Sequence, residues 1–154
     1  MSTDQNNFHE AVNRIFHKDD RYDKGAYYFL RKALDYSVKE GIGQSKDNHI
    51  SAQELLEGIR KFGLDQFGPM TLTLFEYWGV THCEDFGEIV FNLVEAGIFG
   101  RRDEDSKEDF KGGYDFEKAF LYPFLSKKKC QAMERKLAKT EEELNDPDDA
   151  KASG

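Results

Sequence analysis

The sequence is poor in cysteine and has no long apolar segment. Cys83 and Cys130 are its only two cysteines, and no C-x-x-C motif is present. This usage is typical of a protein in a reducing compartment. No apolar run approaches the roughly 18 residues that span a bilayer, and the first ten residues show neither the basic nor the apolar region of a signal peptide. We therefore predict a cytoplasmic protein with no membrane segment.

Motifs for metal binding are also lacking. His9 and His17 lie eight residues apart, and His82 is followed directly by a cysteine. Neither pair has the H-x-x-x-H or C-x-x-C spacing that places two ligands on one face. His49 is remote in the sequence, and whether it converges in space with His82 and Cys83 is left open. We predict scattered capping and surface histidines and no metal site.

The sequence places no clear nucleophile or phosphate-binding loop. Cys83 lies in the first turn of a predicted helix, where amide dipoles lower the pKa of a thiol. Glu84 and Asp85 beside it act in the opposite direction, and no general base is placed nearby by the sequence. The glycine pair at 112–113 precedes a predicted strand rather than a helix, so it reads as a turn. We predict no catalytic residue and no cofactor.

Residues 81–120 form the stretch around which the predicted fold is organised. Thr81 and Glu84 make a capping box at the start of a helix over residues 81–96. Apolar residues recur along this helix at helical period. Gly97 follows the last of them, where a left-handed cap favours glycine.

A β-hairpin is predicted after this helix. Residues 98–102 read as a short strand, residues 103–111 as a polar loop, and residues 114–120, with three aromatic side chains, as the returning strand. A helix followed by such a hairpin is typical of a winged helix. The predicted fold class is therefore mostly α (α+β): a winged-helix-like domain with a β-hairpin wing, an N-terminal helical extension and a C-terminal helix.

The other predicted elements are mainly helices. Periodicity indicates helices over residues 8–18, 24–40 and 70–78, and another that starts at the capping box Ser51–Glu54. A very short strand at residues 49–50 completes the winged-helix order.

The chain divides into three predicted parts. Residues 1–125 form a single domain, residues 126–145 a C-terminal helix, and residues 146–154 a polar, disordered tail. The helix has an apolar seam of about two heptads, short of the three or four that indicate a coiled coil, so we expect it to dock against its own domain. The seam consists of Cys130, Met133, Leu137, Thr140 and Leu144.

The middle third of the chain has few basic residues. Residues 51–100 carry eight acidic side chains against two basic ones. The predicted outward face of the helix over residues 81–96 has no lysine or arginine; it consists of Glu84, Asp85, Glu88, Asn92 and Glu95. A winged helix places this helix in the DNA major groove, and phosphate neutralisation supplies most non-specific affinity. The anionic face therefore disfavours nucleic-acid binding.

Several longer runs form a distinctive set. They are Arg21-Tyr22, Ala26-Tyr27, Ala33-Leu34-Asp35-Tyr36, HISAQELLEGIR at 49–60, Phe67-Gly68-Pro69-Met70, Trp78-Gly79, DFGEIVFNLVE at 85–95, Gly113-Tyr114-Asp115-Phe116 and Ala119-Phe120. Over about residues 15–124, this set resembles a small bacterial family of conserved proteins of unknown function. The resemblance implies a compact cytoplasmic bacterial protein, and it supplies no activity, ligand or catalytic residue.

Together these features favour a non-enzymatic protein–protein interaction domain with an acidic helix face, which binds another protein or a second copy of itself. The candidate contacts are Glu84, Asp85, Glu88, Asn92 and Glu95. Tyr28 is a further candidate, because the N-terminal helices hold more aromatic rings than one helix face buries. In the alternative, the C-terminal helix covers these rings.

Two other classes of function stay open. The first is a winged-helix DNA-binding or transcription-associated factor that uses Arg101-Arg102 and the lysine run 127–129. The second is a small-ligand binder or enzyme with a pocket under the aromatic helices.

Overall fold

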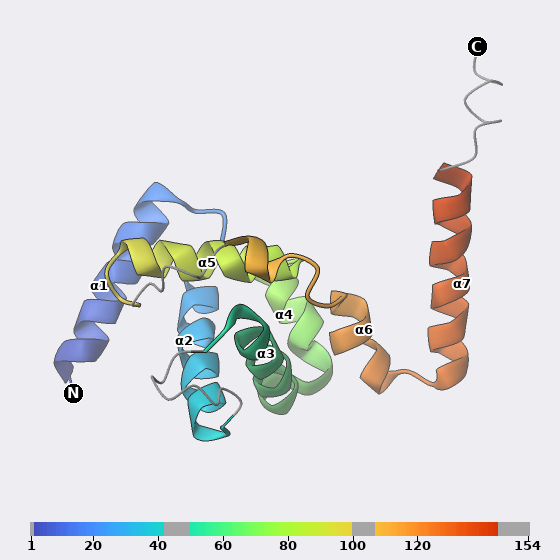
Figure 1. Cartoon of the computed structure of the whole chain (residues 1–154), viewed down its shortest axis with the longest axis horizontal. Coiled ribbons are helices and arrows are strands. Elements are labelled where there is room, and N and C mark those ends of the chain that lie inside the picture. Colours follow the sequence, from blue (N-terminus) through green and yellow to red (C-terminus); the bar gives the residue numbers. More distant parts are fainter. Residues whose placement is uncertain (1, 42–49, 100–106, 145–154) are drawn as a thin grey trace, which may run out of the picture. The chain divides into compact units, whose positions relative to one another are not determined.

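The computed structural model describes residues 2–41, 50–99 and 107–144, which form helices and short connections (Figure 1). The chain divides into two compact units, Met1–Leu121 and Tyr122–Gly154. The first contains α1 (Ser2–Lys18), α2 (Lys24–Lys39), α3 (Ala52–Phe67), η1 (Gly68–Met70), α4 (Thr71–Tyr77), α5 (Cys83–Glu95), η2 (Lys107–Phe110) and α6 (Phe116–Phe120). The second contains η3 (Tyr122–Phe124) and α7 (Lys127–Leu144). No helix within these described ranges is both long and apolar enough to cross a membrane.

Helices α2 and α3 pack side by side in the first unit (Figure 1). The predicted capping box at the start of α3 is confirmed: Glu54 N donates to Ser51 Oγ at 3.2 Å, and Ser51 N donates to Glu54 Oε1 at 3.3 Å. Further along α3, Gly58 lies against Ser37 of α2, whose hydroxyl donates to the Ala33 carbonyl at 2.8 Å. A Cβ at Gly58 would lie 1.7 Å from Ser37 Oγ, so glycine is what permits this close approach.

A cluster of aromatic rings joins four helices in the core of the first unit. Phe75 of α4 is fully buried. Its ring centroid lies 5.0–5.9 Å from those of five other aromatic residues, namely Phe29, Trp78, Phe86, Phe116 and Phe120. Tilted and edge-to-face contacts of this kind add to the stabilisation from apolar burial.

The N-terminal helices belong to this core rather than extending from it. Both α1 and α5 pack on α2. Of the seven aromatic residues in α1, α2 and the turn between them, Phe8, Tyr22, Tyr27 and Phe29 are buried. The other three, Phe16, Tyr28 and Tyr36, are half-buried.

The winged-helix prediction is wrong, because no strand is present among the described residues. The segment predicted as the returning strand contains α6 instead. Asp115 begins α6 by accepting a hydrogen bond from Lys118 N at 3.1 Å. Phe116 and Phe120 are both buried, and residues four apart share one face of a helix. The α+β class and the β-hairpin wing are therefore replaced by helical structure throughout the described chain.

The rest of the predicted hairpin also differs from the structure. Residues 98–99 are irregular, and residues 100–102 lie outside the described part. The predicted polar loop contains η2, whose Phe110 is buried against Gly87 of α5. A Cβ at Gly87 would lie 2.9 Å from Phe110 Cδ2, so glycine makes room for this ring.

The second unit is mainly one helix. Ser126 begins α7, and its hydroxyl accepts a hydrogen bond from Lys129 N at 3.2 Å. The helix occupies Lys127–Leu144, where the sequence predicts a helix over residues 126–145. The predicted tail, residues 146–154, lies outside the described residues.

Candidate functional site

Asp85 organises the start of α5. Its Oδ2 accepts hydrogen bonds from Thr81 N at 2.9 Å and His82 N at 3.0 Å. Its Oδ1 accepts a bond from the Tyr22 hydroxyl at 2.7 Å. Burial, together with this carboxylate, raises the pKa of Tyr22, so the phenol stays protonated and donates. The capping carboxylate is therefore Asp85, one residue after the predicted Glu84.

Glu88, one turn further along α5, forms ion pairs with basic residues from two segments that are distant in sequence. Its Oε2 accepts bonds from Arg21 Nη2 at 3.3 Å and from Lys107 Nζ at 3.1 Å. Arg21 is also bound to Asp19 through Nη2 at 2.8 Å and Nε at 2.9 Å. These bonds from Arg21 hold the pKa of Asp19 well below its usual range. Ion pairs with Glu88 thus connect both the turn after α1 and η2 to α5.

Asn92 connects α5 to the N-terminal helices. Its Nδ2 donates to Asp19 Oδ2 at 3.1 Å and to the Tyr27 hydroxyl oxygen at 3.0 Å. Tyr27 is fully buried, and burial raises the pKa of its phenol. The side-chain amide of Asn92 thus donates both to the buried phenol of Tyr27 and to the carboxylate that Asp19 shares with Arg21.

Of the other three predicted contact residues, Glu84 and Tyr28 form hydrogen bonds within the unit, and Glu95 is exposed. Glu84 accepts a bond from Gly112 N at 3.3 Å. Tyr28 is half-buried, with its hydroxyl hydrogen-bonded to His9 Nδ1 and its ring 5.4 Å from the Phe8 ring. Glu95, in the last turn of α5, is exposed. The predicted acidic face is therefore used largely within the fold, except at its C-terminal end.

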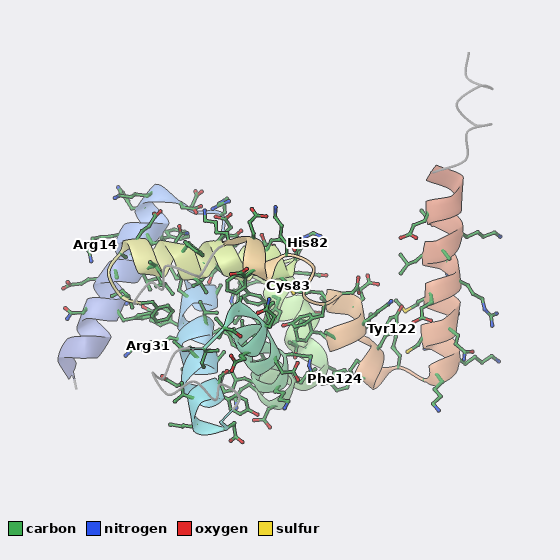
Figure 2. All side chains as sticks on the ribbon, in the orientation of Figure 1. Arg14, Arg31, His82, Cys83, Tyr122 and Phe124 are labelled. Atoms are coloured by element: carbon green, nitrogen blue, oxygen red, sulfur yellow. The ribbon has the colours of Figure 1, made fainter. Side chains whose placement is uncertain are left out.

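A hollow of about 670 Å³ lies at that end, between α1 and α5. The α1 side contributes Asn13, Arg14, Ile15, His17 and Lys18, followed by Asp19; the α5 side contributes Asn92, Glu95 and Ala96. Figure 2 shows Arg14 on α1 beside the C-terminal end of α5, with His82 and Cys83 at the other end of that helix. The α1 side of the hollow therefore carries basic side chains, and the α5 side carries one acidic side chain, Glu95.

Asn13, one of the residues that line the hollow, has a buried polar atom without a partner. Asn13 Oδ1 is buried and accepts no hydrogen bond from any described residue. A buried acceptor left in this state costs about 1–3 kcal/mol.

Among the described residues, no three or more His, Cys, Asp or Glu side chains are placed to hold one metal ion. His82 is exposed, with Nδ1 2.9 Å from Thr81 Oγ1. Cys83 is buried, and its Sγ lies 3.4 Å from both N and O of Tyr114. Burial raises the pKa of Cys83, which makes it a poor nucleophile at neutral pH. His49 lies outside the described residues, so its convergence with the other two stays open.

Sequence reasoning found only part of this site. It named Asn92 and Glu95, which the structure places together in the hollow. It missed Asn13 and Arg14, which were interpreted only as part of a short amphipathic helix. The run at residues 19–23 was interpreted as a charged turn, and nothing in it specifies a contact with a helix about 70 residues away.

Comparisons with protein-family models, with curated proteins and with solved structures gave no match to this chain. The family resemblance of the sequence therefore stays a prediction.

Proposed function

We propose that this protein is a non-enzymatic protein–protein interaction domain that binds a charged segment of another protein in the α1–α5 hollow. The observation that carries the proposal is the hollow itself, with basic side chains on its α1 side and Glu95 on its α5 side.

The charges around the hollow specify the kind of partner. Arg14 and Lys18 line the α1 side, while Glu95 lines the α5 side. A segment that carries an acidic side chain next to a basic one matches both walls. Complementary charges of this kind steer association and fix the register of binding more than they add affinity.

The rest of the acidic face of α5 supports this placement. Asp85, Glu88 and Asn92 make hydrogen bonds within the unit, and these would be broken if a partner took the same atoms. Glu95 is exposed at the free end of the face. The acidic helix face that we propose for binding is therefore its C-terminal end.

The proposal is tested by affinity capture from an extract of the native cells with four matched variants. Glu95→Lys and Arg14→Glu reverse one charge on each wall of the hollow. Lys32→Glu on α2 and Glu76→Lys on α4 reverse exposed charges elsewhere. We expect a protein that is retained by the wild type and both controls and lost from both hollow variants. Equal capture by all five proteins, or no specific capture by the wild type, contradicts the proposal.

A small-ligand site is the second candidate, and the volume of the hollow is the observation in its favour. Pockets for small molecules typically enclose about 300–1,000 Å³, and this one is about 670 Å³. Such pockets have a mainly apolar lining, and the lining surface of this hollow is also mainly apolar, although four of its nine residues carry a charge and another is histidine. A saturable thermal shift with a metabolite, lost in Glu95→Lys, would favour this candidate.

The DNA-binding alternative loses its basis, because the wing on which it depended is absent from the described residues.

A further inference from the structure

Helix α7 carries most of its basic residues on one side. Residues 127–140 include six basic residues and one acidic one, and all six basic side chains are exposed. At 3.6 residues per turn, five of the six fall within about a third of the helix circumference. This basic face consists of Lys128, Lys129, Arg135, Lys136 and Lys139. We propose that it binds the phosphate backbone of a duplex nucleic acid without reading the base sequence.

The basic face is not neutralised within its own helix. Four of its five residues, all except Lys139, have no Asp or Glu three or four positions away, which is the spacing of ion pairs on a helix. Among the described side chains of α7, residues 127–141, no ion pair is formed. Glu134 and Glu141 fall close to the opposite side of the helix, and the face ends before the glutamates at 141–143. Its positive charge is therefore available to a ligand.

Like charges also lie beside one another on this face. Arg135 and Lys139 are four residues apart, and Lys136 and Lys139 are three apart, spacings at which like charges destabilise a helix. The lysines at 127–129 add positive charge to the positive end of the helix dipole. An anion that contacts the face reduces both repulsions, so its binding should stabilise α7.

The length of the basic face suits a duplex better than a small anion. Lys128 and Lys139 are eleven residues apart, which is about 17 Å along the helix axis. A duplex carries about ten phosphate charges over that length. Four of the five side chains are lysines, which contact phosphates as point charges. Binding of this kind needs neither a wing nor a recognition helix, and it does not depend on the α1–α5 hollow.

A membrane surface fits α7 less well. Helices that lie in a membrane interface insert a face rich in Trp, Phe or Leu side chains. Among the described side chains of α7, Met133 and Leu137 are the only large apolar ones, and the helix has no aromatic residue. An electrostatic ligand such as the phosphate backbone requires no apolar face.

The charge of the first unit opposes this binding. That unit holds 23 acidic and 15 basic residues, so it repels a polyanion at a distance. The contact should therefore be weak at physiological salt and strongly dependent on the salt concentration. Salt dependence is the measurement that identifies it.

The first experiment measures binding of the full chain to a labelled DNA duplex by fluorescence anisotropy. We expect a dissociation constant of about 10 µM or below at 50 mM salt, and a rise of about 100-fold to 1,000-fold by 200 mM, because four or five neutralised phosphates give a log–log slope near −4. Two duplexes of unrelated sequence should bind equally. The proposal is overturned by a lack of binding at 50 mM salt up to about 100 µM protein, which is the result expected if the first unit of the same chain occupies the face.

Two double variants with the same net charge locate the contact. Lys128→Gln/Arg135→Gln removes two charges from the basic face. Lys32→Gln/Lys118→Gln is the control and removes two exposed charges from the first unit. The face variant should raise the dissociation constant at least about tenfold at 50 mM salt and make the slope less steep by about two, whereas the control should change both little. Glutamine is about as good a helix former as lysine and arginine, so α7 should persist, which circular dichroism checks. Equal effects of the two variants overturn the proposal.

Anionic vesicles distinguish a nucleic acid from a membrane. Met133→Gln/Leu137→Gln removes the two large apolar side chains and leaves the basic face intact. We expect this variant to bind DNA as the wild type does, and the wild type not to sediment with phosphatidylserine–phosphatidylcholine vesicles at physiological salt. Vesicle binding that is tighter than DNA binding and is lost in this variant overturns the proposal in favour of a membrane surface.

Discussion

The contact between Gly58 and Ser37 gives a sharp test of the α2–α3 packing. Gly58→Ala would place a methyl group 1.7 Å from Ser37 Oγ and 2.9 Å from Ser37 Cβ. Ser37 must then rotate, which breaks its hydrogen bond to the Ala33 carbonyl at a cost of about 1 kcal/mol. Rotation leaves the Cβ contact too short, so the two helices must also separate, and overpacking of this kind costs about 1–3 kcal/mol.

The helix propensity of alanine acts in the opposite direction. A glycine-to-alanine change in an open helix stabilises by about 1 kcal/mol. We therefore expect Gly58→Ala to lower the free energy of unfolding by a net ~1–3 kcal/mol, measured by urea denaturation followed by circular dichroism. If the variant is instead stabilised by about 1 kcal/mol, the close approach of the two helices is refuted.

A second substitution separates the clash from other effects. Ser37→Gly removes both of the atoms that the new methyl group would meet. The double variant Gly58→Ala/Ser37→Gly should therefore lose less stability than the sum of the two single variants, with a coupling energy of about 1–3 kcal/mol. Additive losses would contradict the contact.

Two further predictions concern charge and thiol chemistry. Arg21→Gln should destabilise the fold by about 1 kcal/mol or less at pH 7, because Arg21 is 55% exposed and binds Asp19 and Glu88 at the surface. Since the pKa of Asp19 is lowered by folding, this stabilisation is present above about pH 4, the pKa of an unfolded aspartate, and is lost as the pH falls further. Urea denaturation at pH 7 and pH 3 checks it, and an equal loss at both values refutes it. Cys83 is buried with a raised pKa, so a thiol reagent at pH 8 should modify Cys130 in the native protein and Cys83 only after unfolding; in Cys130→Ser, rapid labelling would contradict the burial of Cys83.

The sequence predicted helices well where their start signals are local. Ser51 and Glu54 lie three residues apart and form the predicted capping box. The β-hairpin prediction was wrong because the spacing of aromatic residues over 114–120 fits either a short strand or a short helix. Tyr114, Phe116 and Phe120 were interpreted as alternation along a strand, although Phe116 and Phe120 are also one helical turn apart, and Asp115 is a good N-cap. In so short a segment the capping residue was the better guide.

The candidate site was less predictable because its contacts are distant in sequence. The outward face of α5 was expected to be free, yet Glu88 binds Arg21 and Lys107, which are 67 and 19 residues away. Periodicity reports which face of a helix is polar. It does not report whether that face meets water or another polar segment of the same chain.

The bonds between α5 and the N-terminal helices have a consequence for synthesis on the ribosome. Tyr27 and Asn92 are 65 residues apart, and Tyr22 and Asp85 are 63 apart. At about 5–20 residues per second, Tyr27 leaves the ribosome roughly 3–13 seconds before Asn92. During that interval the rings that α5 later covers, including Tyr27, have no native cover from that helix. The nascent chain is therefore most prone to chaperone capture after α2 emerges, and completion of α5 ends that period.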